Sequence, residues 1–328
     1  MIILTGGAGF IGSNLLRGLN RLGRTDILVV DDLTRGEKHR NLNSLDFADY
    51  CDKRELLARL PSLLEQGVEA IVHQGACADT MQADGRYLME NNFQISKTLL
   101  LAAQAARVPF IYASSASVYG DGTKGFSEER ACEYPLNAYA YSKFLFDQYV
   151  RRTITAPTAL VVGLRYFNVY GPREQHKGRM ASVIHHFTKQ LKETGAIRMF
   201  QGSGGYGGGE QRRDFVFVND LAYINMFFGG LLPESPMLPV KAVVNAGSGE
   251  ARTFKAVAEA LMQVHGPGTI EYIPFPADLK DRYQHFTAAD LTGLRKAGYT
   301  ASFTPLEEGV RHTFASDATE KESTEAPE

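Results

Sequence analysis

Thr5-Gly6-Gly7-Ala8-Gly9-Phe10-Ile11-Gly12 is the stretch of this chain that decides its fold. It directly follows the apolar residues 1–4, which are typical of a short buried strand. Glycines at these positions let the backbone turn tightly, approach a pyrophosphate and pack the next helix against the sheet. The amide groups at the N-terminus of that helix would then face the phosphate charge. The stretch therefore predicts a dinucleotide-binding turn.

A second apolar run, residues 27–30, ends in Asp31 and Asp32. Leu15, Leu19 and Leu22 lie between the two runs at helical spacing, which predicts a helix there. An acidic residue about 20 positions after the last glycine is where a ribose-binding carboxylate is expected. Strand, turn, helix, strand and acid together predict one βαβ unit.

Composition excludes several classes of function. The chain has 328 residues, with 35 Lys and Arg against 37 Asp and Glu, so its net charge of −2 gives no global basis for binding nucleic acid or an anionic membrane. No apolar stretch approaches the ~20 residues that span a bilayer. The first strand begins at residue 1 and leaves no room for a signal peptide, so we expect a cytoplasmic protein.

Cysteine and histidine spacing gives no indication of a metal site. Cys51, Cys77 and Cys132 are odd in number and far apart, which argues against disulfides and against a Cys-x-x-Cys motif. The eight His residues show no ligand spacing such as H-E-x-x-H. We therefore expect no bound metal.

Apolar segments alternate with helical patterns along the first half of the chain. Residues 70–72, 110–113 and 159–164 predict further strands, and residues 96–106 predict a helix between two of them. This alternation predicts an α/β fold, a doubly wound parallel sheet of the Rossmann type with helices on both faces. We assign residues 1–170 to this dinucleotide-binding domain.

The second half is less regular. Residues 171–315 are assigned to a smaller carboxy-terminal α/β substrate lobe that is interleaved with the last sheet elements. Within it we expect a helix at 180–193, a glycine-rich loop at 200–211, and strands at 214–218 and 243–245. Residues 316–328 lack apolar residues to bury and are predicted to be disordered.

Tyr139 and Lys143 are spaced i and i+4, one helical turn apart on the same face. A free Tyr is a poor base at neutral pH, but a neighbouring ammonium favours its phenolate. Ser115 follows a predicted strand, so its hydroxyl lies where open α/β sheets bind ligands. Taken alone, the Tyr and Lys would more often be a surface pair than a catalytic one.

Together, the glycine turn, Asp31, Ser115, Tyr139 and Lys143 occur in the order and spacing of the extended short-chain dehydrogenase/reductase family. The chain resembles that family over most of its length. Segments 26–31, 74–78, 165–174, 213–216 and 270–276 further resemble its ADP-heptose 6-epimerase branch. Segment 165–174 is shared widely among nucleotide-sugar enzymes, whereas His176-Lys177-Gly178 and residues 272–276 are more specific.

The resemblance implies an isomerase that inverts C6 of ADP-D-glycero-β-D-manno-heptose through a 6-keto intermediate, supplying the heptose precursor of the lipopolysaccharide core. The implied catalytic residues are Tyr139, Lys177 and Ser115. Lys177 can act as a base only if burial or nearby positive charge lowers its pKa. Without the resemblance, a solvated loop lysine would be the favoured interpretation of Lys177.

The motif and the resemblance together imply two sets of binding residues. The expected cofactor contacts are Gly6, Gly9, Phe10, Ile11, Gly12, Asp31, Asp32, Lys38, Lys53, Gln74, Gly75, Ala76, Cys77, Ala78, Asn91, Lys143, Val169 and Lys177. The expected substrate contacts are Asn168, Arg179, His186, Phe200, Gln201, Gly202, Ser203, Arg213 and Tyr272. An Arg at 179 in place of a small Ser, and the long loop 202–209, depart from the family pattern. That loop is interpreted as a mobile lid or as a surface insertion.

The choice of cofactor depends on opposing signals. Asp31 favours NAD, because a carboxylate binds a ribose 2′-hydroxyl, whereas Lys38 and Lys53 match positions that contact a 2′-phosphate in the resembling branch. We expect NADP, with NAD as the alternative. The resemblance also implies a homopentamer.

Two other functions remain open at this stage. One is another nucleotide-sugar epimerase, such as a UDP-hexose 4-epimerase. The other is a non-catalytic regulator that binds NADP.

Overall fold

A computed structural model of the chain describes residues 1–236, 241–276 and 283–322, with the backbone alone described for 316–322. The elements of the first half are β1 (Ile2–Thr5), α1 (Phe10–Arg21), β2 (Ile27–Asp31), η1 (Gly36–Asn41), β3 (Asp49–Asp52), α2 (Leu56–Glu65), β4 (Ala70–His73), α3 (Gly85–Leu88), η2 (Met89–Gln94), α4 (Ile95–Ala106), β5 (Phe110–Ser115), η3 (Ala116–Tyr119), η4 (Arg130–Cys132), α5 (Ala138–Thr153) and β6 (Val161–Tyr166). Those of the second half are β7 (Asn168–Tyr170), η5 (Gln175–Met180), α6 (Val183–Thr194), β8 (Ala196–Phe200), β9 (Arg212–Phe217), α7 (Val218–Phe228), β10 (Lys241–Ala246), β11 (Ala251–Thr253), α8 (Phe254–His265), β12 (Thr269–Ile273), α9 (Thr292–Lys296) and α10 (Leu306–Glu322).

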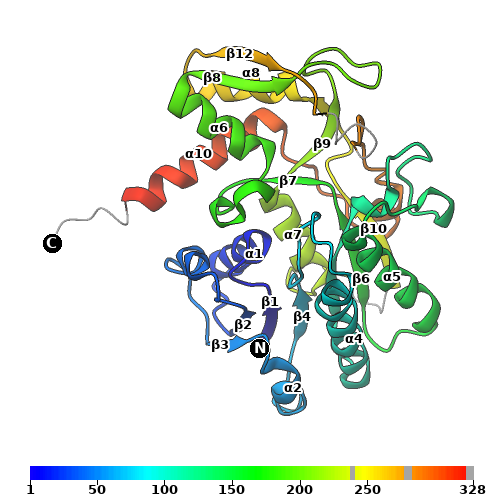
Figure 1. Cartoon of the computed structure of the whole chain (residues 1–328). Coiled ribbons are helices and arrows are strands. Elements are labelled where there is room, and N and C mark those ends of the chain that lie inside the picture. The colour runs from blue at the N-terminus through cyan, green and yellow to red at the C-terminus, as the bar shows by residue number, and fades with distance from the viewer. Residues whose placement is uncertain (237–240, 277–282, 323–328) are drawn as a thin grey trace.

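A seven-stranded sheet with the order β10-β6-β5-β4-β1-β2-β3 forms the centre of the molecule (Figure 1). Every neighbouring pair in it is parallel. The chain reverses its direction of travel across the sheet between β1 and β4, and open α/β sheets bind ligands at the carboxyl ends of the strands beside such a reversal. The predicted α/β fold, a doubly wound parallel Rossmann sheet, is confirmed.

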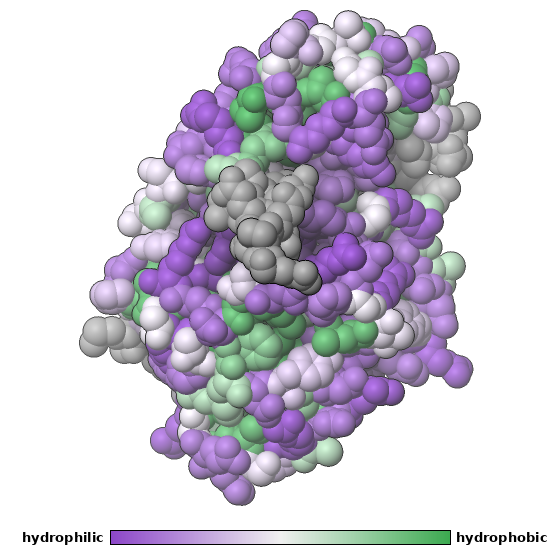
Figure 2. All heavy atoms as spheres, turned by 90° about the vertical axis from the view of Figure 1, so that its left-hand side faces the viewer, coloured by the Kyte–Doolittle hydropathy of each residue, from purple (hydrophilic) through white to green (hydrophobic). Residues whose placement is uncertain are grey.

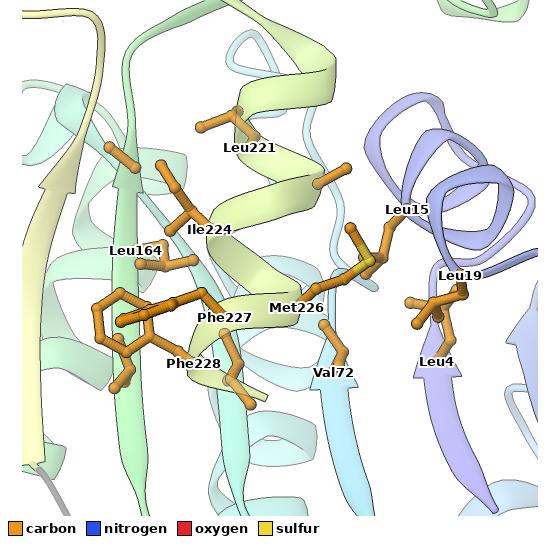
Figure 3. Close-up of a cluster of buried hydrophobic side chains, with 14 of the residues drawn as sticks. Leu4, Leu15, Leu19, Val72, Leu164, Leu221, Ile224, Met226, Phe227 and Phe228 are labelled. Atoms are coloured by element: carbon orange, nitrogen blue, oxygen red, sulfur yellow. The ribbon is translucent and has the colours of Figure 1, made fainter. Parts of the chain in front are cut away.

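Alternate side chains of the strands fill two cores, one on each face of the sheet. On one face Leu4, Val72 and Leu164 pack against α1 and α7, as Figure 3 shows. On the other face, Ile3 and neighbouring strand residues pack against α2, α4 and α5. Both faces are covered by helices, which explains why the strand sequences are apolar runs rather than alternating ones.

A smaller lobe lies beyond the carboxyl ends of the strands (Figure 1). It contains the three-stranded sheet β11-β9-β7 and the pair β12-β8. Helices α6, α8 and α10 bury Phe187, Leu261 and Val310 against these strands. The chain enters this lobe at β7 and then returns to the large sheet with β10, so elements of the two parts are interleaved along the sequence.

Helix α10 corrects the predicted start of a disordered tail at residue 316, because the helix continues to Glu322. Leu306 and Val310 anchor its first turns in the lobe core, and adding residues to an established helix is easier than starting one. The predicted tail residues 323–328 lie outside the described part of the chain.

The face of the molecule on the side of α10 is mostly hydrophilic, with hydrophobic residues in limited groups (Figure 2). Within the described residues, no helix has both the length and the apolar character that crossing a bilayer requires.

Candidate functional site

The glycine turn between β1 and α1 leaves no space for side chains. Gly6 has a φ of +69°, and a Cβ there would come within 2.7 Å of the amide nitrogen of Gly75. A Cβ on Gly12 would collide with the carbonyl oxygen of Gly6. Since the N-cap of α1 is Gly9, no side chain caps this helix. The amide groups of Phe10 and Ile11 at its first turn therefore suit an anion such as a pyrophosphate.

Two carboxylates at the end of β2 are each paired with a lysine. Asp31 accepts a hydrogen bond from the Ala8 amide at 2.8 Å and forms an ion pair with Lys38. Lys53 pairs with Asp32 at 2.8 Å and holds the pKa of that carboxyl well below its usual range. Asp31 thus fixes the glycine turn, and the lysines offset the negative charge at the position where a ribose is expected.

The loop after β4 is held by residues on several elements. The side chains of Gln74, Tyr166 and Asn225 form a closed triangle of hydrogen bonds of 2.8–3.0 Å. The Gly75 amide donates to the Thr5 hydroxyl at 3.0 Å. Gln74 was predicted to contact the cofactor. In the structure its side chain holds the loop after β4 in place through these hydrogen bonds.

Asn92 in η2 forms two hydrogen bonds with the backbone of the loop after β4. Its side chain accepts from the Cys77 amide at 2.8 Å and donates to the Cys77 carbonyl at 3.1 Å. The predicted contact Asn91 instead donates to the Tyr87 carbonyl at 2.9 Å. A π turn shifts the helix by one residue here, and such turns are frequent at functional sites.

His73 explains how β4 and the glycine turn are joined. Its ring bonds the Thr5 hydroxyl at 2.6 Å and the Ser96 hydroxyl at 2.8 Å, and Ser96 in turn donates to the Asn92 carbonyl. Burial lowers the pKa of His73 to about 3, so the ring is neutral. Sequence analysis missed His73, although a histidine at the end of an apolar strand is a visible signal.

Tyr139 and Lys143 extend from α5, which begins at the N-cap Asn137. Lys143 donates to the Ala113 carbonyl of β5 at 2.7 Å, and burial lowers its pKa to about 8. Burial raises the pKa of Tyr139, an effect that a hydrogen bond with the Ser115 side chain opposes. Cys77 is close enough to influence both groups. The structure thus brings Ser115, Tyr139 and Lys143 together with Cys77 of the loop after β4.

A buried network of charged side chains lies next to Ser115 and fixes the end of β5. The Arg165 guanidinium is fully buried and pairs with Asp147 at 2.9 Å and with Glu133. Asp147 also accepts from Ser114, the neighbour of Ser115, at 2.9 Å. The network was missed because its partners are distant in sequence, although Arg165 at the end of an apolar run gave a signal.

Lys177 in η5 lies against the glycine turn, with its ammonium 4.9 Å from the centre of the Phe10 ring. Burial lowers the pKa of Lys177, while the nearby Glu174 opposes this shift. Its neighbour His176 lies close to the Lys38 and Asp31 pair, and burial lowers the pKa of His176 to about 4. Lys177 is thus a half-buried lysine beside the cofactor turn, not a solvated loop residue.

The lobe contributes a buried guanidinium. Arg213 on β9 is 7 % exposed, lies 4.8 Å from the Tyr283 ring centre and 5.8 Å from that of Phe254, and donates to the backbone carbonyl of Arg212. Burial lowers its pKa, and no carboxylate pairs with it among the residues that the structure describes. A buried cation of this kind needs an anion, and its planar fork suits phosphate.

A hollow of roughly 440 Å³ is lined by Gln201, Gly202, Gly208 and Tyr272. The glycine-rich loop beside it is shaped by two ring contacts. A Cβ on Gly204 would come within 2.6 Å of the His285 ring, and one on Gly208 within 2.7 Å of the Tyr272 ring. His285 also bonds Ser203 at 3.0 Å and stacks on Tyr206. The loop therefore packs against aromatic rings, and two of its glycines leave the space that these rings occupy.

The other predicted substrate residues are more dispersed. Asn168 is exposed and accepts a hydrogen bond from Thr287 at 3.3 Å, and Phe200 packs on Phe275. His186 lies beside the His185 ring on α6. Arg179 forms an ion pair with Asp79 at 3.0 Å. Of the remaining predicted cofactor residues, Ala76 and Ala78 lie in the loop after β4, and Val169 lies on β7 between two hydrophobic cores.

Comparison with known proteins gives concordant matches. A profile of the NAD dependent epimerase/dehydratase family matches residues 2–229. The ADP-L-glycero-D-manno-heptose-6-epimerase of Alkalilimnicola ehrlichii is 55 % identical over 313 residues, which are 95 % of this chain and 96 % of that protein.

Two solved structures are similar over nearly their whole length. The ADP-L-glycero-D-manno-heptose-6-epimerase of Helicobacter pylori has a TM-score of 0.80 and 28 % identity, covering 96 % of this chain and 95 % of the other. The UDP-glucose 4-epimerase of Thermotoga maritima, solved with UDP-glucose, has a TM-score of 0.76 and 27 % identity, covering 97 % of this chain and 98 % of the other.

Proposed function

The chain belongs to the NAD dependent epimerase/dehydratase family, and from this premise we propose that it inverts C6 of ADP-D-glycero-β-D-manno-heptose to give the L-glycero epimer. The observation that carries the proposal is the position of Lys177, half-buried against Phe10 of the glycine turn. Inversion at this carbon requires that hydride leave one face and return to the other, while the hydroxyl oxygen loses its proton in one orientation and regains a proton in the other. A second acid/base group beside the cofactor turn meets this requirement.

The glycine turn, the Lys143 ammonium and the loop after β4 suit a nicotinamide dinucleotide, since the turn excludes side chains and offers helix amides to a pyrophosphate. When bound, the nicotinamide supplies reversible hydride transfer at the carbinol carbon, which gives a 6-keto form of the sugar. The side chains of the protein hold the sugar and move the hydroxyl proton.

Tyr139 is proposed as one acid/base group, with Ser115 donating a hydrogen bond to the same sugar oxygen. Burial raises the pKa of Tyr139 and so favours its protonated form. A positive charge beside it, from Lys143 or an oxidised nicotinamide, favours the phenolate that accepts the proton.

Lys177 is proposed as the second acid/base group. Burial has already lowered its pKa, as a neutral lysine base requires. The nearby Glu174, whose own pKa is raised by burial, opposes this shift. We propose that Lys177 exchanges the hydroxyl proton in one orientation of the sugar and Tyr139 in the other.

For the cofactor we propose NADP, with NAD as the alternative. Lys38 and Lys53 stand beside Asp31 and Asp32 and offset the charge that would repel a 2′-phosphate. Recovery of NAD alone from the denatured protein would reject this choice.

The ADP part of the substrate is proposed to bind the lobe. Arg213 supplies the buried cation for the diphosphate, and the hollow beside Tyr272 takes the remainder of the nucleotide. Asn168, His186 and residues 200–203 are proposed as further contacts. Arg213→Gln tests the diphosphate contact, because it removes the charge and keeps an N–H donor of similar reach; weaker binding of ADP is expected.

The direct experiment incubates cofactor-loaded protein with ADP-D-glycero-β-D-manno-heptose and follows the configuration of C6 by NMR. We expect conversion to an equilibrium mixture of both epimers. UDP-glucose is tested in parallel as the alternative substrate. Inversion of its C4, with no change in the heptose, would favour a UDP-hexose 4-epimerase. A folded, loaded protein that converts neither would favour the non-catalytic regulator.

A further inference from the structure

Residues 172–180, here called the strap, cross the loops at the carboxyl ends of the large sheet. The Pro172 carbonyl accepts a hydrogen bond from Asn14 of α1 at 2.9 Å. The Arg173 side chain donates to the Asn41 carbonyl at 2.8 Å, while the Asn41 side chain donates to Ala8 of the glycine turn at 3.0 Å. One end of the strap is therefore firmly fastened to the glycine turn and to the segment after β2.

The other end of the strap carries two cations, separated by one residue, that have different partners. Lys177 lies over the Phe10 ring, whereas Arg179 reaches Asp79 in the loop after β4, with a distance of 3.0 Å between Nη2 and Oδ2. Gly178 between them has φ +53° and ψ −125°, a conformation that glycine adopts far more readily than other residues. This backbone reversal lets neighbouring side chains reach opposite walls of the site.

Asp79 is held in position to receive Arg179. Its Oδ1 accepts a hydrogen bond from the Met81 amide at 2.9 Å, which leaves Oδ2 for the guanidinium. The Arg179 side chain is 70 % exposed and that of Asp79 is 36 % exposed. Such an exposed pair is weak and is screened by salt, so it can open and close repeatedly.

The strap thus joins the three parts of the chain that suit a dinucleotide: the glycine turn, the end of β2 and the loop after β4. We propose that Arg179 and Asp79 form a latch that closes the strap over the bound dinucleotide, which slows its release and keeps Lys177 in place. This inference rests on the nicotinamide cofactor of the proposed function. It gives Arg179 a role other than the substrate contact expected from sequence.

Release of reduced cofactor tests the latch without any turnover. Protein loaded with NADPH is mixed with excess NADP, and the nicotinamide fluorescence reports the rate of release. The variants are Arg179→Ser, Asp79→Asn and the double variant, and Asn at 79 can still accept the Met81 hydrogen bond. At low salt each variant is expected to release NADPH about 2- to 5-fold faster, which lies within the range that an exposed ion pair supports.

The double variant, the salt dependence and a charge swap test whether Arg179 and Asp79 act as a pair. The double variant should match the single ones, because each change removes the same pair. Salt should accelerate release more in the wild type than in the variants, because the variants keep only the salt dependence of the phosphate contacts. The charge swap Asp79→Arg with Arg179→Asp should restore slow release. Arg198→Ser is the matched control, since it breaks the exposed pair with Glu271 on the distant strands β8 and β12.

Unchanged release in both single variants, or additive effects in the double variant, would overturn the latch. An increase in substrate KM with unchanged release would do the same and return Arg179 to the substrate site. Wild-type protein that retains neither NADP nor NAD would overturn both the latch and the cofactor part of the proposed function. Equal melting temperatures of the cofactor-free variants would establish that faster release is not a result of unfolding.

Discussion

Tyr139 and Lys177 carry the proposed proton transfers from two separate elements, α5 and η5. Tyr139→Phe and Lys177→Met are each expected to lower kcat by at least ~10²-fold, as removal of a general acid/base does. Tyr141→Phe and Lys189→Met are the matched controls, because both residues are exposed on α5 and α6. Inversion of C6 is followed by NMR for all four variants. A rate near that of the wild type in either test variant removes that residue from the mechanism.

Lys143 gives the site a defined pH dependence. Its ammonium is charged below a pKa of about 8 and loses the charge as pH rises through that value. If the charged form binds the cofactor ribose, the affinity for NADPH should fall above about pH 8. Titration calorimetry over a pH series measures this, and Lys143→Met should bind weakly with little pH dependence. An affinity of the wild type that stays constant through this range would exclude the ribose contact.

The same pKa shift affects stability with the opposite sign. The ordinary pKa of Lys143 is 10.5, so between about 8 and 10.5 the unfolded chain holds a proton that the folded chain has released. Stability from this group therefore rises with pH across that window. Binding and stability thus respond to pH in opposite directions, which separates a local effect on the cofactor from a general loss of folding.

Lys38 and Lys53 decide the cofactor preference in our proposal. Lys53→Met is expected to weaken NADP binding by about 10-fold, because one charge contact with the 2′-phosphate is lost. NAD has no such phosphate, so its affinity should change less than about twofold. Equal losses for both nucleotides would mean that Lys53 acts by holding Asp32 rather than by contacting the cofactor.

The glycine-rich loop between β8 and β9 can be tested as an element with a matched pair of substitutions. Gly204 and Gly205 both have positive φ, but a Cβ on Gly204 would strike the His285 ring, whereas a Cβ on Gly205 meets nothing within 4 Å. Both alanine variants carry the strain of a left-handed residue, roughly 1–2 kcal/mol. Only Gly204→Ala should also displace His285 from Tyr206 and weaken ADP binding, by about 10-fold against less than threefold for Gly205→Ala. Equal affinities for ADP would support a surface insertion.

The elements that the sequence predicted are those whose own residues form a contiguous apolar run or a regular helical spacing. β1, β2, β5 and β6 were found because both faces of the sheet are covered. β12 was missed since its residues are half exposed and alternate weakly, and α2 contains Pro61, which breaks a helical pattern.

At the site, too, the sequence predicted only the pairs of residues that lie close together along the chain. Tyr139 and Lys143 are one turn apart and could be paired from sequence, whereas the Asn92 hydrogen bonds with Cys77 and the Arg179 pair with Asp79 join residues that only the folded chain brings together. The cofactor contact expected at Asn91 stays a prediction, and the π turn at Met89–Gln94 changes the helical register beside it in a way that sequence spacing does not reveal.

For the whole molecule, two hydrophobic cores join residues from both sides of residue 170, where we place the boundary between the two parts. One core joins Leu4 and Leu19 to Phe228 and Tyr299, and another joins Phe10 to Phe187 and Leu261. β10 returns from the second half to pair with β6 at the sheet edge. We therefore expect the two parts to unfold together in one cooperative transition, although the proposed ligands bind different parts.

Ligand-induced stabilisation tests this coupling. A ligand at 100 times its Kd stabilises the folded state by about 2.7 kcal/mol. ADP, proposed to bind Arg213 in the lobe, and NADP, proposed to bind the glycine turn, should each raise the melting temperature of the same single transition by a few degrees. Far-UV and near-UV circular dichroism should give coincident curves with either ligand. Two transitions, each shifted by one ligand alone, would instead mean that the lobe folds independently and that the shared cores contribute little to cooperativity.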